Sequence, residues 1–91
     1  MNMFKSFAEV KRALTLGSTW ECTFQGNNSL GIREVGEVQT NGVGFKTNRD
    51  TLSWLYYPKA KFIVLTEGGF DVLNERTGEV QLSYTLLDRG E

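Results

Sequence analysis

The sequence predicts an α+β domain that is mainly β, in which an N-terminal helix packs on a small antiparallel meander. Two observations carry this prediction. Apolar residues recur at helical spacing only near the start of the chain, and from Gly17 onward they alternate with a period of two. Tight turn signals separate the alternating runs, which is typical of consecutive antiparallel strands rather than βαβ units. The meander is expected to form a partly closed barrel or a strongly curled sheet.

Residues 4–16 are predicted to form the helix. Ser6 followed three residues later by Glu9 is a capping box, in which side chains satisfy two backbone N–H groups at the start of a helix. Gly17 stands where a left-handed residue commonly ends a helix. The apolar stripe consists of Phe7, Val10 and Leu14.

Seven short strands are expected after the helix, at residues 18–25, 31–40, 43–47, 52–57, 61–66, 70–74 and 79–87. The alternation slips beside Gly36, which a β-bulge or sharp bend would explain. Asn41-Gly42 predicts a hairpin whose two turn residues take positive φ. Gly78 fits the left-handed position of the last hairpin. Residues 58–61 are predicted to form a short turn or a single helical turn.

This order of features resembles a small SH3-like barrel: a long bent second strand, a two-residue hairpin, a further hairpin, a one-turn helix and a closing strand. The resemblance concerns the fold and implies no function. The 91 residues are expected to form one domain, residues 1–91, and an apolar fraction of 40% is enough for a core without a metal or a disulfide.

The composition argues against catalysis and against metal or cofactor binding. The chain has no histidine, and Cys22 is its only cysteine, so the commonest general base and the usual zinc ligands are missing. Cys22 alternates in phase with Trp20 and Phe24, which predicts a buried, unreactive thiol. The sequence therefore predicts that the protein is not an enzyme and has no cofactor.

Charge and cysteine content also bear on location and partners. A formal net charge of −1 argues against a duplex-DNA binder that relies on bulk charge. The N-terminal residues include charges and no long apolar run, so neither a signal peptide nor a membrane span is expected. A single cysteine fits a reducing compartment, and a cytoplasmic location is predicted.

A candidate binding surface lies within residues 46–61. Four cations and three aromatic residues gather there, against Asp50 as the only carboxylate. On a strand, Trp54 and Tyr56 share one face, while Leu55 and Tyr57 share the other. The candidate surface consists of Lys46, Arg49, Trp54, Tyr56, Tyr57, Lys59 and Lys61.

Three interpretations fit this segment. It is a central strand with its aromatic residues in the core and its lysines at the rim, or a surface that binds a protein through aromatic and cationic anchors. The third interpretation is a surface for single-stranded nucleic acid or a nucleotide, on which bases stack beside cations.

The C-terminal third suggests a different function, in structure or self-assembly. Residues 62–91 carry six carboxylates against Arg76 and Arg89, opposite in sign to the basic middle of the chain. The last strand is long and alternates cleanly. If that strand lies at a sheet edge, it is expected to pair with another copy and form a homo-oligomer.

The motif Ser53-Trp54-Leu55-Tyr56-Tyr57-Pro58-Lys59-Ala60 resembles small proteins of unassigned function in bacteriophages and prophages, which often place such a motif after an asparagine-glycine hairpin. The resemblance covers residues 4–65. It implies an accessory viral protein in the cytosol of the bacterial host that binds and blocks a host enzyme or sequesters a defence nucleotide. It assigns no functional residue, and it favours a binding protein directed at a host protein.

Overall fold

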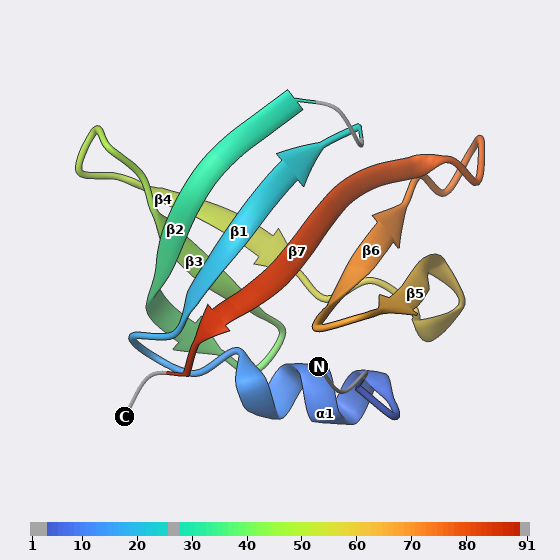
Figure 1. Ribbon diagram of the computed structural model, residues 1–91, viewed down its shortest axis with the longest axis horizontal. Coiled ribbons are helices and arrows are strands. Elements are labelled where there is room, and N and C mark those ends of the chain that lie inside the picture. The colour runs from blue at the N-terminus through green and yellow to red at the C-terminus, as the bar shows by residue number, and fades with distance from the viewer. Residues whose placement is uncertain (1–3, 26–27, 90–91) are drawn as a thin grey trace.

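The computed structural model describes residues 4–25 and 28–89, and these form a curled sheet of seven antiparallel strands with one short α-helix (Figure 1). The mainly β class and the strongly curled sheet are confirmed. The order of strands across the sheet is β4-β3-β2-β1-β7-β6-β5. The elements are α1 (Phe7–Ala13), β1 (Thr19–Phe24), β2 (Asn28–Gln39), β3 (Gly42–Lys46), β4 (Leu52–Tyr56), the one-turn 3-10 helix η1 (Ala60–Phe62), β5 (Ile63–Thr66), β6 (Gly69–Leu73) and β7 (Val80–Asp88).

The long strand β2 makes the sheet curl. Its first half pairs with β1 and its second half with β3, and the register shifts between Val35 and Glu37. The bulge predicted at Gly36 is therefore confirmed. In Figure 1 the bent β2 carries β3 and β4 across behind β1. The curl brings the inner faces of both halves of the sheet onto one core.

Two other local predictions are confirmed. Gly78 takes a positive φ of 75° in the β6–β7 hairpin. Its N–H donates to the carbonyl of Asn74 at 2.8 Å. The helical turn predicted near Pro58 is η1, which connects β4 to β5.

Helix α1 is shorter than predicted. Ser6 caps it as expected, with its Oγ accepting from the N–H of Glu9 at 3.3 Å, while the Glu9 carboxylate accepts from the N–H of Lys5. The helix ends at Ala13 because Leu14 leaves helical geometry and enters the core with 1% of its surface exposed. Gly17 is left-handed as predicted, with φ 86°.

Four aromatic rings in successive contact lie at the centre of the core. Tyr84 of β7 stacks on Phe45 of β3 at 5.3 Å between ring centroids and on Phe70 of β6 at 5.0 Å. Phe70 meets Trp20 of β1 edge to face at 5.7 Å. The contacts Phe45–Tyr84 and Trp20–Phe70 join strands that are not neighbours in the sheet, whereas Phe70 and Tyr84 lie opposite each other on paired strands. The other buried apolar residues are Val10, Ala13, Leu14, Cys22, Val35, Val43, Leu55 and Val72.

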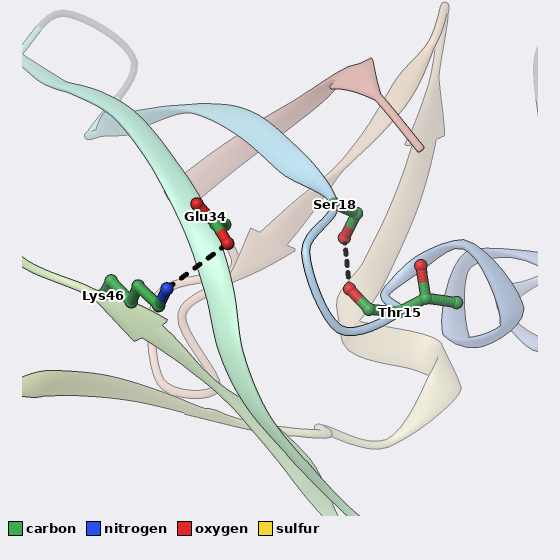
Figure 2. Close-up of polar contacts among 4 residues, drawn as sticks. All are labelled: Thr15, Ser18, Glu34 and Lys46. Atoms are coloured by element: carbon green, nitrogen blue, oxygen red, sulfur yellow. Dashed lines mark hydrogen bonds and ion pairs between the residues drawn. The ribbon is translucent and has the colours of Figure 1, made fainter. Parts of the chain in front are cut away.

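Ser18 links α1 to the sheet and was not foreseen from the sequence. It is fully buried, and its hydroxyl donates to the carbonyl of Thr15 at 2.7 Å, as Figure 2 shows. The same hydroxyl oxygen accepts from the indole N–H of Trp20 at 3.0 Å. The backbone carbonyl of Ser18 accepts from the N–H of Val35 at 2.9 Å. Both bonds of its hydroxyl are satisfied, so the burial carries little penalty.

The hairpin predicted at Asn41-Gly42 exists, but its geometry differs from the prediction. Gly42 lies inside β3, opposite Gln39 and Tyr56, and neither Asn41 nor Gly42 takes a positive φ. The turn therefore begins one residue earlier, at Thr40. A Cβ on Gly42 would overlap the carbonyl oxygen of Leu55. Close approach of β4, and not the turn, requires glycine at this position.

The last strand is not at an edge of the sheet. β7 lies between β1 and β6 and pairs with both. Its backbone is already used on both sides, so the premise of self-association through this strand is wrong. The edge strands are β4 and β5.

Candidate functional site

Strand β4 presents one face to the core and the other to solvent. Leu55 is 6% exposed and belongs to the core. Trp54 and Tyr56 lie on the opposite face, with ring centroids 6.1 Å apart and planes 16° from parallel. Tyr56 is 61% exposed, and Trp54 is half-buried. The interpretation as a central strand with its aromatic residues in the core is therefore wrong for this pair. We call Leu52, Trp54 and Tyr56 the outer row of β4.

Glycines on β3 support the outer row. Gly44 lies opposite Trp54, and a Cβ on Gly44 would come within 3.3 Å of both the Trp54 ring and the Leu52 side chain. Gly42 lies opposite Tyr56. Because Gly44 has no side chain, Trp54 and Leu52 of β4 lean over the backbone of β3. This explains why Trp54 is half-buried although its strand is at the edge.

Lys46 is held by an ion pair that the sequence did not reveal. Its Nζ lies 3.3 Å from the carboxylate of Glu34 on β2, and Figure 2 shows the two side chains meeting across the outer face of the sheet. Glu37 shares this face, since it lies opposite Gly44. The pair is about half exposed and contributes little stability. It does, however, reduce the charge that Lys46 offers to a ligand.

Tyr57 does not join the outer row. Its ring meets Phe7 of α1 edge to face at 5.8 Å, and the Nζ of Lys11 lies 5.2 Å from its centroid. Burial raises the pKa of the Tyr57 phenol above its usual value. Tyr57 therefore holds the helix against the sheet, and its predicted place on the binding surface is not supported.

The other three predicted cations flank β4. Arg49 lies in the β3–β4 loop, just before the strand, and Lys59 and Lys61 follow the strand around η1. All three are exposed. The candidate site therefore consists of the outer row of β4 with Arg49 at one end and the two lysines at the other.

The Cys22 thiol is not placed to act as a nucleophile. Cys22 is 1% exposed, and burial raises the pKa of its thiol to about 11, so it remains protonated at neutral pH. In residues 4–25 and 28–89, no group of three or more carboxylates and thiols is placed to hold a metal ion. No helix in these residues has the length and apolar content needed to cross a bilayer.

An open hollow of about 550 Å³ lies beside the β6–β7 hairpin. Its walls contain one carboxylate, that of Glu79, and neither a cation nor a nucleophile paired with a base. The lining residues are Gln25, Asn74, Thr77, Glu79, Val80 and Gln81.

Comparisons with family models, curated proteins and solved structures found no match to this chain. The function is therefore inferred from the geometry of β4 and its surroundings.

Proposed function

We propose that this chain is a non-enzymatic binding protein whose ligand is another protein, and that the outer row of β4 is the binding surface. The observation that carries the proposal is the stacked pair of Trp54 and Tyr56, held outside the core on an edge strand. Aromatic residues and arginine are the most frequent anchors of protein interfaces. Arg49 stands at one end of the row.

The resemblance of residues 53–60 to phage proteins extends this proposal. The ligand would then be a host protein in the bacterial cytosol, and the chain would act by covering a surface of that protein. Such a role requires no catalytic group. The likeness to an SH3-like barrel remains a prediction about the fold and adds nothing to the proposal.

Binding of single-stranded nucleic acid or a nucleotide is the second candidate. Two near-parallel rings beside three exposed cations favour it, because bases stack on such rings and phosphates pair with such cations. The carboxylates of Glu34 and Glu37 on the same outer face oppose it, and Lys46 is already paired. This candidate predicts that an oligonucleotide quenches tryptophan fluorescence at low salt.

The proposal is tested by comparing Trp54→Ala and Tyr56→Ala with Ile32→Ala. Ile32 is 68% exposed on β2 and gives a matched loss of exposed apolar surface away from β4. Immobilised wild-type protein and Ile32→Ala should retain the same protein from a bacterial lysate. Each β4 variant should lose about 2 kcal/mol of binding free energy, or about 30-fold in Kd, which is typical of an interface hot spot.

Two results would contradict the proposal. Either the wild-type protein retains nothing above background, or the two β4 variants bind as well as Ile32→Ala. Near-UV circular dichroism should show that all three variants keep the packed core, since none of the substituted side chains belongs to it.

A further inference from the structure

The backbone of β4 offers hydrogen bonds along its outer edge. The N–H of Tyr57 donates to the carbonyl of Asn41 at 2.8 Å. At the other end of the strand, the N–H of Thr47 donates to the carbonyl of Thr51 at 3.0 Å. In an antiparallel pair, every second residue directs both its N–H and its C=O to the neighbouring strand. Counting from Tyr57, residues 53 and 55 therefore face β3, and residues 52, 54 and 56 face away from it.

These outward groups have no protein partner in the described part of the chain. β4 is the last strand of the sheet, and no turn, loop or cap hydrogen bond reaches Leu52, Trp54 or Tyr56. Three N–H and three C=O groups thus stand in a row at strand spacing. A row of this kind is a template for a further strand.

The residues that offer this backbone are also the outer row. A strand that bonds to the edge of β4 would therefore place every second side chain beside Leu52, Trp54 and Tyr56, at about 5 Å between Cβ atoms. The backbone bonds would supply affinity, and contacts with the two rings would supply selectivity. A nucleic acid would contact the rings but has no row of alternating N–H and C=O groups to match the edge.

The charges near the edge of β4 determine whether a positively or a negatively charged ligand is favoured. Arg49 and Asp50 precede β4 and carry opposite charges, and Lys59 and Lys61 follow it; all four residues are exposed. The carboxylates of Glu34 and Glu37 lie on β2, so an added strand would be about 14 Å away, three strand spacings. This exceeds the screening length of about 8 Å at physiological salt. The nearer charges are three cations against Asp50, a net charge of +2, and they favour a negatively charged segment.

A second copy of this chain fits the edge poorly. If two β4 strands paired in antiparallel orientation, Arg49 and Asp50 of one copy would approach the two lysines at the far end of the other, and their opposite charges would cancel. A parallel pair would place Lys59 and Lys61 beside their counterparts. Neither arrangement compensates the two lysines, so a second copy lacks the charge complementarity of an acidic segment.

We infer that the ligand is an extended, acidic polypeptide segment that joins the sheet as a new strand beside β4. This inference rests on the proposed function of the same strand and names its ligand class. It makes the amides of residues 52, 54 and 56, rather than the rings alone, part of the binding site.

Amide exchange measured by NMR tests the inference directly. The probe is a short synthetic peptide that alternates valine with glutamate, and its control alternates valine with lysine. Saturation with the acidic peptide should slow exchange of the Trp54 and Tyr56 amides about tenfold or more. The amides of Ser53 and Leu55, which already face β3, should change little. The lysine peptide should bind at least about tenfold more weakly.

Three results would overturn the inference: no binding of the acidic peptide, equal binding of both peptides, or unchanged exchange of the Trp54 and Tyr56 amides at saturation. If an oligonucleotide binds and the acidic peptide does not, nucleic acid replaces protein as the ligand class.

A matched pair of variants separates this inference from the proposed function. Leu52→Pro removes one outward N–H, and Leu52→Ala removes the same side chain while keeping that N–H. Proline is tolerated on edge strands where its N–H would face solvent. Leu52→Pro should therefore bind the acidic peptide about tenfold more weakly than Leu52→Ala does.

A peptide test on wild-type protein gives the same information if Leu52→Pro does not fold. The acidic peptide is N-methylated at every second amide, either at those that would donate to β4 or, as the control, at those that would point away from it. The first peptide should bind more weakly than the control. If the blocked peptide and Leu52→Pro both bind as well as their controls while Trp54→Ala abolishes binding, strand addition is wrong and the proposed function stands. If Trp54→Ala also binds normally, both are wrong.

Discussion

Cys22 and Tyr84 face each other across β1 and β7 in the core. Burial is the main cause that raises the pKa of the Cys22 thiol to about 11 and raises that of the Tyr84 phenol above its usual value. Both groups are neutral in the folded protein well above neutral pH. In the unfolded chain both would ionise at lower pH, so the two states bind different numbers of protons in alkaline solution.

This difference predicts alkaline destabilisation. A raised folded-state pKa contributes stability that is present below the unfolded-state value, 9.0 for Cys22, and is lost as pH rises toward about 11. The free energy of unfolding from urea titrations should therefore fall by about 2 kcal/mol over this range from Cys22 alone. Cys22→Ala should lower stability at neutral pH but remove this part of the slope. An unchanged slope in that variant would show that the thiol is not the source.

The alternation of side chains along β4 made it possible to predict which face of the strand some site residues occupy. Alternation placed Leu55 on one face and Trp54 with Tyr56 on the other, and the structure agrees. The same alternation placed Tyr57 with Leu55, and Tyr57 does pack on the core side, against Phe7 of the helix. The error was to include Tyr57 in the candidate surface. The ion pair between Lys46 and Glu34 was missed because it joins two strands across a bulge, where the register does not follow from the pattern.

At the level of elements, the β3–β4 pair depends on its glycines. A Cβ on Gly42 would overlap the Leu55 carbonyl and lie 3.0 Å from the Tyr56 Cα, both of which are backbone atoms. Gly42→Ala should therefore push β4 away from β3 and destabilise the fold by about 3 kcal/mol, as overpacking does.

The matched control for this substitution is Gly78→Ala. Its Cβ would meet no atom within 4 Å, so the cost comes only from the positive φ of 75°, about 1 kcal/mol. Urea unfolding measures both variants. Equal costs would mean that β4 does not need the close approach at Gly42.

Element boundaries were mostly predictable because turns, glycines and alternation are local signals. The strands predicted at residues 52–57 and 79–87 lie within one residue of β4 and β7 at each end. The hairpin at Asn41-Gly42 shows the limit of such signals. The dipeptide is common in turns, but the contact with Leu55 places its glycine in the strand instead.

The order of strands across the whole molecule was not predictable from these patterns. An alternating strand has the same pattern at the edge of a sheet as in the middle, because alternation reports which face is buried and not how many neighbours a strand has. The last strand therefore looked suited to the edge, and residues 52–57 looked suited to the centre. The structure places β7 inside the sheet and β4 at its end.

The cations around β4 predict how the whole molecule behaves in solution. They should oppose pairing of two β4 edges, so the wild-type protein should sediment as a monomer at low salt. Replacing Asp50→Asn, Lys59→Glu and Lys61→Glu together would place acid beside an uncompensated Arg49 of a second copy in an antiparallel pair. This triple variant should form dimers, as measured by analytical ultracentrifugation. A dimeric wild type, or a triple variant that stays monomeric, would contradict the proposed role of these charges.

The stack of Phe45, Tyr84 and Phe70 spans the interior from β3 to β6. Phe45 lies on the strand that pairs with β4, directly opposite Ser53. The stack thereby holds β3, the neighbour of the edge strand β4, against β7 and β6 in the other half of the sheet. An incoming segment would meet a template that is already rigid, so the conformational entropy lost on association would come almost wholly from the segment itself.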